Sequence, residues 1–142
     1  MSPAYGSNVT SNSPLQAVTP DQQVPATLFS AETPAAGEAS LAVALMPRTP
    51  TGQLTPVSVR LSCPLGLGAG VFQIQTADVV PTGDTAGVDF CSEGFNGANP
   101  GTISSSNVNA SGVARVELIL RARFLRVLCV TAPSNPVTVT VE

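Results

Sequence analysis

Apolar and polar residues alternate along most of the chain after residue 25, and a period of two residues is typical of β-strands with one buried face. The alternation is clearest at the C-terminal end, where the segment PVTVTVE follows the turn signal PSNP. There Val137, Val139 and Val141 are predicted to face a core, with Thr138 and Thr140 on the other side. The same pattern predicts further strands over 26–32, 40–47, 56–63, 71–76, 113–120 and 121–131.

Three of these segments predict which residues share a face. In 40–47 one face holds Leu41, Val43 and Leu45, and in 56–63 it holds Val57, Val59, Leu61 and Cys63. In 113–120, Val116, Leu118 and Leu120 oppose Arg115, Glu117 and Ile119. A helical spacing can also be traced through 113–127, but its β-branched content favours a pair of strands.

The connections between these strands carry turn signals rather than helical patterns. The stretch 77–111 is rich in Gly, Asn, Asp and Ser, with room only for short strands at 86–91 and 101–105. The lack of helical connections excludes a parallel α/β sheet. The predicted fold class is therefore all-β, an antiparallel β-sandwich or jelly roll over residues 26–142.

Residues 1–25 differ in composition from the rest of the chain. Ser, Asn, Pro, Thr, Gln and Ala dominate there, and Asp21 is the only charged residue. Four prolines divide the segment, so neither a helix nor a central strand is expected. We therefore divide the chain into an extended N-terminal arm, 1–25, and one β-domain, 26–142.

The charge balance argues against binding of nucleic acid. Only 11% of the residues are charged, all six basic residues are Arg, and the net charge is −3. A protein that binds DNA or RNA normally has a basic excess and exposed aromatic side chains for stacking. With five Phe, one Tyr and no Trp, the chain has neither feature, and we expect no nucleic-acid partner.

Candidate chemistry is sparse. The chain has no His, the commonest general base and metal ligand. Its three cysteines lack the close spacing of zinc or redox motifs. The densest group of acids has gaps wider than those of a calcium loop, which favours solvated loop carboxylates: it comprises Asp78, Asp84, Asp89 and Glu93. We therefore predict no catalytic activity, no metal and no cofactor.

The cysteines and the chain start indicate where the protein is made. Cys63 and Cys129 fall within valine-rich segments and are expected to be buried and inert, whereas Cys91 is the more accessible thiol. The N-terminal residues lack the pattern of a signal peptide, and no run approaches the ~20 apolar residues of a membrane helix. We expect synthesis in the cytoplasm, reduced thiols and no membrane partner.

Four of the six arginines fall between residues 115 and 126. On a pair of strands, Arg115 and Arg121 would share an exposed face with Glu117, while Arg126 fits either face. Two interpretations follow: a solvated outer face, or a surface that binds carboxylates of a partner through the forked guanidinium groups.

The arm at 1–25, the β-rich body and the ending RFLRVLCVTAPSNPVTVTVE resemble, in outline, the head decoration or cement proteins of bacteriophages. No motif is shared residue by residue. The resemblance implies a structural protein on the capsid exterior of the virion, which stabilises the shell. Its partners would be the major capsid protein and neighbouring copies of itself, in a homo-oligomer on the capsid. The residues expected to contact these partners are Pro3, Tyr5, Pro14, Leu15, Pro20, Pro25, Arg115, Arg121 and Arg123.

A second interpretation is a carbohydrate- or receptor-binding β-sandwich module of a phage tail, a fibre or a surface adhesin. The scarcity of aromatic residues argues against it, because sugar-binding platforms favour aromatic side chains. A secreted pilin-like subunit would need an export signal and usually paired cysteines. An enzyme ranks last.

Overall fold

The computed structural model describes residues 25–45, 54–78 and 90–142, and strands dominate these ranges. The elements are β1 (Ala26–Glu32), β2 (Val43–Ala44), β3 (Thr55–Ser62), β4 (Val71–Ala77), β5 (Cys91–Ser92), a 3₁₀ turn (Ser105–Asn107), β6 (Val113–Leu120), β7 (Phe124–Thr131) and β8 (Val137–Val141). No α-helix occurs within the described ranges. The prediction of an all-β fold is confirmed.

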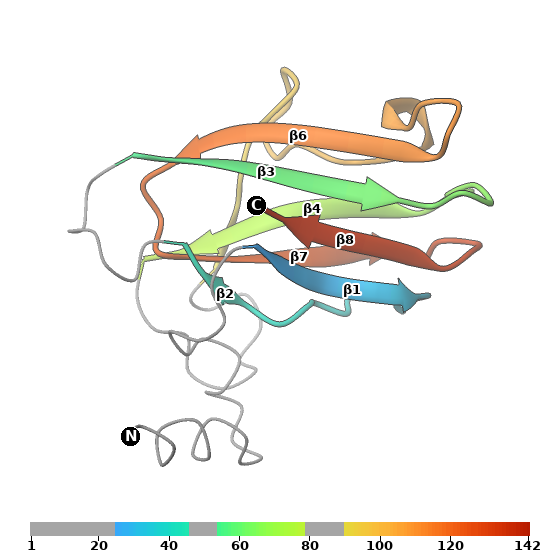
Figure 1. Ribbon diagram of the computed structural model, residues 1–142, viewed down its shortest axis with the longest axis horizontal. Helices are drawn as coiled ribbons and strands as arrows, with labels where there is room; N and C mark the ends of the chain where they lie inside the picture. The colour runs from blue at the N-terminus through green and yellow to red at the C-terminus, as the bar shows by residue number, and fades with distance from the viewer. Residues whose placement is uncertain (1–24, 46–53, 79–89) are drawn as a thin grey trace, which may run out of the picture.

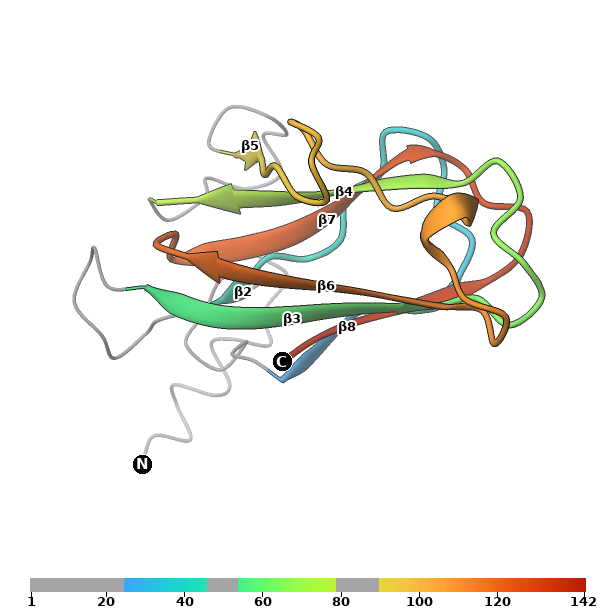
Figure 2. The ribbon, with the colours of Figure 1, turned by 90° about the horizontal axis from the view of Figure 1, so that it is seen from above.

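The strands form two four-stranded sheets in which all neighbouring strands are antiparallel. The strand order is β1-β8-β3-β6 in the first sheet and β2-β7-β4-β5 in the second. Two views of the ribbon show the sheets as layers that lie face to face (Figures 1 and 2). Of the connections between consecutive strands, only that from β4 to β5 stays within one sheet.

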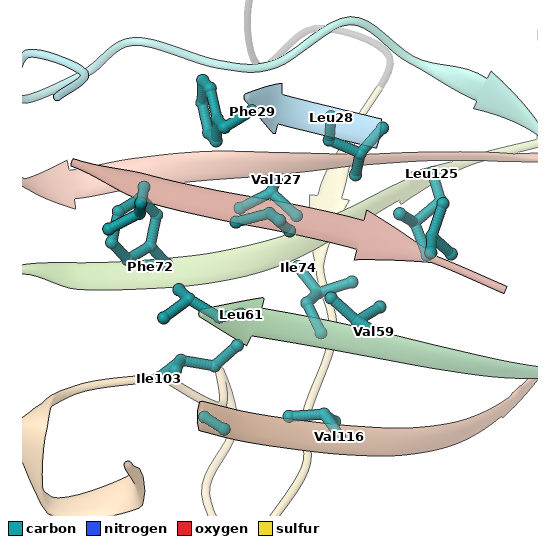
Figure 3. Close-up of a cluster of buried hydrophobic side chains, with 14 of the residues drawn as sticks. Leu28, Phe29, Val59, Leu61, Phe72, Ile74, Ile103, Val116, Leu125 and Val127 are labelled. Carbon is teal, nitrogen blue, oxygen red and sulfur yellow. The ribbon is translucent and has the colours of Figure 1, made fainter. Parts of the chain in front are cut away.

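The core lies between the two sheets and is built from their inward faces. Val59 and Leu61 of β3 are fully buried, as are Phe72 and Ile74 of β4 in the opposite sheet (Figure 3). Phe72 also meets the ring of Phe29 from β1 edge to face, with 6.2 Å between the ring centroids. Since aromatic residues are few, aliphatic side chains fill most of the remaining space between the sheets.

The alternation predicted at the C-terminal end is confirmed in β8. Val137, Val139 and Val141 are fully buried, while Thr138 and Thr140 are partly exposed on the other face. β8 lies between β1 and β3 in its sheet, so both of its edges are paired. This central position explains why the strand has such a regular pattern: one face meets the core and the other meets solvent along its whole length.

β1 departs from simple alternation because two irregularities interrupt its pairing with β8. Between Thr27 and Glu32, successive residues of β1 are not paired with successive residues of β8. Such shifts in register are the signature of β-bulges. The first irregularity allows two consecutive residues, Leu28 and Phe29, to point into the core. Near the second, Ala31 has a positive φ of 50°.

The segment 40–47 forms less strand than its pattern predicts. Within 40–45, the part of the segment that the structure describes, only β2 is paired as a strand. Leu41 is 61% exposed, although it was expected to share the buried face of Val43 and Leu45. Burial does not alternate between Ala42 and Leu45, because both faces of the segment are covered there. One side joins the main core through Val43 and Leu45, and the other joins a second cluster through Ala42 and Ala44.

The remaining predicted strands agree with the structure only in part. Residues 113–131 form two strands as predicted, but β6 and β7 lie in different sheets and do not pair with each other. In place of a strand at 101–105, only Ile103 forms an isolated bridge, with Phe72. Of the segment 86–91, residues 86–89 lie outside the described residues, as do residues 1–24 of the arm.

Candidate functional site

A pocket of about 390 Å³ opens at one end of the two sheets, where β4 and β6 finish. The turn between β6 and β7 is held beside β4 by the Arg123 N–H, which donates to the Ala77 carbonyl at 3.1 Å. Residues of both sheets and of this turn line the pocket: Leu54, Thr76, Ala77, Asp78, Cys91, Glu93, Ile119, Arg121 and Ala122. The pairing of the strands, rather than one loop, therefore positions the pocket.

The side chains that line the pocket combine a thiol, a hydroxyl, charged groups and exposed aliphatic groups. Thr76 Oγ1 donates to Glu93 Oε2 and lies 3.9 Å from Cys91 Sγ. A cysteine nucleophile needs a base beside it, and the chain has no His to serve as one. Leu54 and Ile119 are 57% and 68% exposed. Exposed aliphatic surface beside charged groups is typical of a protein contact site.

The arginines predicted to contact partners lie in three different places. Arg115 is exposed on β6, Arg121 lines the pocket, and the Arg123 guanidinium lies 5.5 Å from the centre of the Phe124 ring. Arg121 directly follows the end of β6 and is exposed, and it lines the pocket together with Ile119, which lies on the same face of β6 as Arg115. Of the arm residues proposed as contacts, Pro25 is exposed directly before β1; the others lie outside the described residues.

Arg115 shares the outer face of its sheet with a second arginine that the sequence pattern did not single out. Arg60 of β3 is its direct cross-strand partner. On the same face, Ser58 Oγ donates to Glu117 Oε2 at 3.0 Å. Like charges directly opposite each other repel. The Arg60–Arg115 pair is therefore a local site of positive charge that a carboxylate could neutralise.

Arg126 is buried, although it lies on the side of β7 that faces away from the main core. Its guanidinium lies 4.0 Å from the centre of the Phe90 ring, and its Nε donates to Gln75 Oε1 at 2.8 Å. Gln75 Nε2 in turn donates to Ser92 Oγ at 3.4 Å. Burial lowers the pKa of Arg126, yet a guanidinium keeps its charge in proteins. A lone Arg within the apolar run FLRVLCV, residues 124–130, was the available signal for this site.

The acidic residues considered for calcium divide between the described and undescribed parts of the chain. Asp78 and Glu93 both line the pocket, whereas Asp84 and Asp89 lie outside the described residues. Within 25–45, 54–78 and 90–142, no three His, Cys, Asp or Glu side chains come together as metal ligands. The described ranges also contain no helix with the length and hydropathy needed to cross a membrane.

Brief labelling of the native protein with a bulky thiol reagent is expected to modify Cys91 and to spare Cys63 and Cys129. Cys91 is exposed, and the other two are fully buried. Burial raises the pKa of Cys63, and burial together with the charge of Glu38 raises that of Cys129. Both effects suppress the reactive thiolate. Mass spectrometry before and after denaturation checks this; equal labelling rates for all three would contradict it.

The same pKa shifts predict a pH dependence of stability. A thiol whose pKa is higher in the folded state binds its proton more tightly there than in the unfolded chain. The stability contributed by Cys63 and Cys129 is thus complete below the pKa of an unfolded cysteine. It is lost as the pH rises through the folded-state pKa values, so alkaline pH should weaken the fold.

The fold places this chain in the class of all-β proteins built from two four-stranded antiparallel sheets. No protein-family model, curated protein or solved structure matches the chain.

Proposed function

We propose that this protein is a virion structural protein that decorates the outside of a bacteriophage head and stabilises its shell. The observation that carries the proposal is the order of the strands. The order β1-β8-β3-β6 facing β2-β7-β4-β5 agrees with that expected for an eight-stranded jelly roll, a fold found in viral capsid domains, lectins and cupins. A jelly-roll sandwich with an extended arm is the architecture we propose for the whole chain.

The side chains favour the viral class among proteins with this fold. The aromatic residues of the described ranges are all buried, and sugar-binding platforms need exposed ones: they are Phe29, Phe72, Phe90, Phe95 and Phe124. A metal-dependent enzyme on this fold would lack the commonest metal ligand, because the chain has no His. Among the described residues, no particular group of side chains supports either a sugar-binding module or a metal-dependent enzyme.

Stabilising a shell requires contact area buried against the capsid subunits and many identical copies of that contact, rather than catalysis. The end pocket with its exposed Leu54 and Ile119 offers apolar contact area, and Arg121 and Asp78 beside them offer polar contacts. Each contact can be weak, because a copy that binds two capsid subunits at once gains from effective concentration. The proposed partners are the major capsid protein and neighbouring copies of the chain.

Shell binding tests the proposal directly. Full-length protein is mixed with mature heads that lack it, prepared from the phage that encodes the chain, and the heads are sedimented. We expect saturable binding in proportion to the number of capsid subunits, and heads that rupture at a higher temperature once decorated. Absence of binding would refute the proposal, and binding to a glycan array without binding to heads would favour the carbohydrate-binding alternative.

Deletion of residues 1–20 is expected to reduce occupancy on heads by about tenfold or more, the loss that follows when one of two linked contacts is removed. The melting temperature of the body should stay nearly unchanged, because the arm has few large apolar residues to contribute to a core. An arm of the same composition in scrambled order is the matched control. If the truncated protein decorates heads as fully as the intact one, the contact lies on the body, with the Arg115–Arg126 region as the next candidate.

A further inference from the structure

Three of the four edge strands of the two sheets are poorly suited to pair with another chain. β2 and β5 have only two residues each. β1 carries two irregularities and the positive φ of Ala31. Short and bulged edges are devices by which proteins prevent strands from adding at a sheet edge. β6 differs from the other three, since its eight residues pair with β3 without any irregularity (Figure 1).

The main-chain groups along the outer side of β6 can be assigned from the ladder with β3. Beyond the end of that ladder, the Cys63 N–H donates to the Gly112 carbonyl at 2.7 Å. In an antiparallel ladder the bonding direction alternates from residue to residue. Counting from Gly112, the even-numbered residues of β6 therefore bond to β3. Arg115, Glu117 and Ile119 direct their N–H and C=O groups away from it.

This outer edge is closed at one end and open along the rest. At Val113 both main-chain groups are bonded to Asn109: the Asn109 N–H donates to the Val113 carbonyl at 2.9 Å, and the Val113 N–H donates to Asn109 Oδ1 at 3.0 Å. Within the described residues, no hydrogen bond reaches the outward groups of Arg115, Glu117 or Ile119. Alternate residues thus present three donors and three acceptors at the spacing of a strand.

We propose that the open edge of β6 binds residues 4–13 of a neighbouring copy as an added strand. An added strand needs main-chain donors, which prolines lack. The segment 4–13 is the longest stretch without proline in the arm, and it includes the β-favouring residues Val9 and Thr10. It has no charged residue. An uncharged strand suits this edge, because Arg115 and Glu117 carry charges of opposite sign and a charged strand would be repelled by one of them.

The position of the arm on the body favours a neighbour over the same copy. The arm precedes β1, and β1 and β6 are the opposite edges of one sheet (Figure 1). The described chain starts at Pro25 beside the β1 edge, so the arm of the same copy would have to cross the whole sheet to reach its own β6, whereas the β6 edge of a molecule beside β1 is adjacent. Each copy then gives an arm on one side and receives one on the other. Such a head-to-tail contact generates rings or open chains.

The inference extends the proposed function by naming the contact between neighbouring copies. It is tested on the free full-length protein, in the absence of heads. A negative result therefore leaves the shell-binding experiment unaffected, and a failure of shell binding leaves this test unaffected.

The first variant removes one donor from the edge. Glu117→Pro deletes an N–H that points away from β3, so the ladder within the sheet keeps its hydrogen bonds. Glu117→Gln is the matched control, which removes the charge and keeps the N–H. We expect self-association, measured by sedimentation over a range of concentrations, to weaken by about tenfold for Glu117→Pro, the value of roughly one main-chain hydrogen bond. Glu117→Gln should associate like the wild type.

The second pair of variants lies in the arm, within the segment proposed as the added strand. Neighbouring residues of an added strand alternate between facing the edge and facing away, so replacing both Val9 and Thr10 with proline removes a donor in either register. Val9→Ala with Thr10→Ala is the control. The proline pair should lower self-association at least as much as Glu117→Pro, and the alanine pair should lower it less.

Hydrogen exchange identifies the edge that is used. In the associated wild type, the amides of Arg115, Glu117 and Ile119 should exchange slowly, and dilution should make them fast. An associated protein whose three amides exchange rapidly would overturn the proposal, because another surface would hold the copies together. A protein that stays monomeric at all concentrations would overturn it as well. Slow exchange of the three amides in that monomer would mean that residues of the same chain bind the β6 edge.

Discussion

Replacing Phe72 with alanine is expected to lower the free energy of unfolding by about 3–5 kcal/mol, the range for a fully buried Phe. Phe72 is 0% exposed and lies on β4. Its ring packs edge to face with that of Phe29 from the opposite sheet (Figure 3). Truncation therefore leaves a cavity between the layers, where the surrounding strands cannot collapse without losing their own pairing.

Urea unfolding followed by circular dichroism measures this loss. Leu65→Ala is the matched control, because Leu65 is 78% exposed and its removal should change stability by less than about 0.5 kcal/mol. A Phe72→Ala variant as stable as the control would show that the two sheets do not share the core described above.

Replacing Gly112 with alanine is expected to cost about 2–5 kcal/mol, from left-handed backbone strain and from a steric clash together. Gly112 precedes β6 with a φ of +81°, and a Cβ atom there would lie 2.5 Å from the Cys63 carbonyl oxygen. That carbonyl belongs to the main chain just after β3, so it cannot swing aside as a long side chain would. The start of β6 and the end of β3 would have to separate.

Gly37→Ala isolates the strain from the clash. Gly37 has a similar φ of +89°, but nothing lies within 4 Å of the position of its Cβ. Gly37→Ala should therefore lower the free energy of unfolding by only about 1–2 kcal/mol, the cost of the left-handed backbone conformation alone. Thermal or urea melts of the two variants give the difference directly. Equal losses would mean that the contact between Gly112 and Cys63 is looser than described.

The strands themselves could be predicted from the sequence because their alternation has one dominant cause. β3 and β8 each bury one face and expose the other, so the apolar period of Val57, Val59 and Leu61 matches the burial that the structure has. The prediction for 26–32 coincides with β1, and that for 113–120 coincides with β6. Burial of Cys63 and Cys129 follows from the same periodicity.

The pattern was less informative wherever both faces of a segment are covered. In β7, four consecutive residues from Phe124 to Val127 are buried, since one side faces the main core and the other lies under the cluster that includes Phe90. A period of two cannot report burial on both sides. This is also why Arg126 could be assigned to neither face from its position in the sequence.

The candidate contact sites depended still more on tertiary structure. The sequence marked Arg115, Arg121 and Arg123 as one cluster because they are close along the chain. In the structure Arg115 lies on β6, whereas Arg121 and Arg123 lie in the turn that carries the chain from one sheet to the other. Arg60, which is far from Arg115 in sequence, becomes its direct neighbour through strand pairing. The pocket likewise combines Leu54, Glu93 and Arg121, which no local motif connects.

The sequence by itself determined the class of the fold, the positions of the main strands and the face that most of them bury, because these depend on local periodicity and turn residues. It did not determine which strand pairs with which, because an alternating strand presents similar hydrogen-bonding groups and a similar apolar face to any partner. Only the tertiary structure placed β8 between β1 and β3 and left β6 at an edge. The open edge of β6 follows from that order, since a main-chain group is free or bonded according to its neighbours in space.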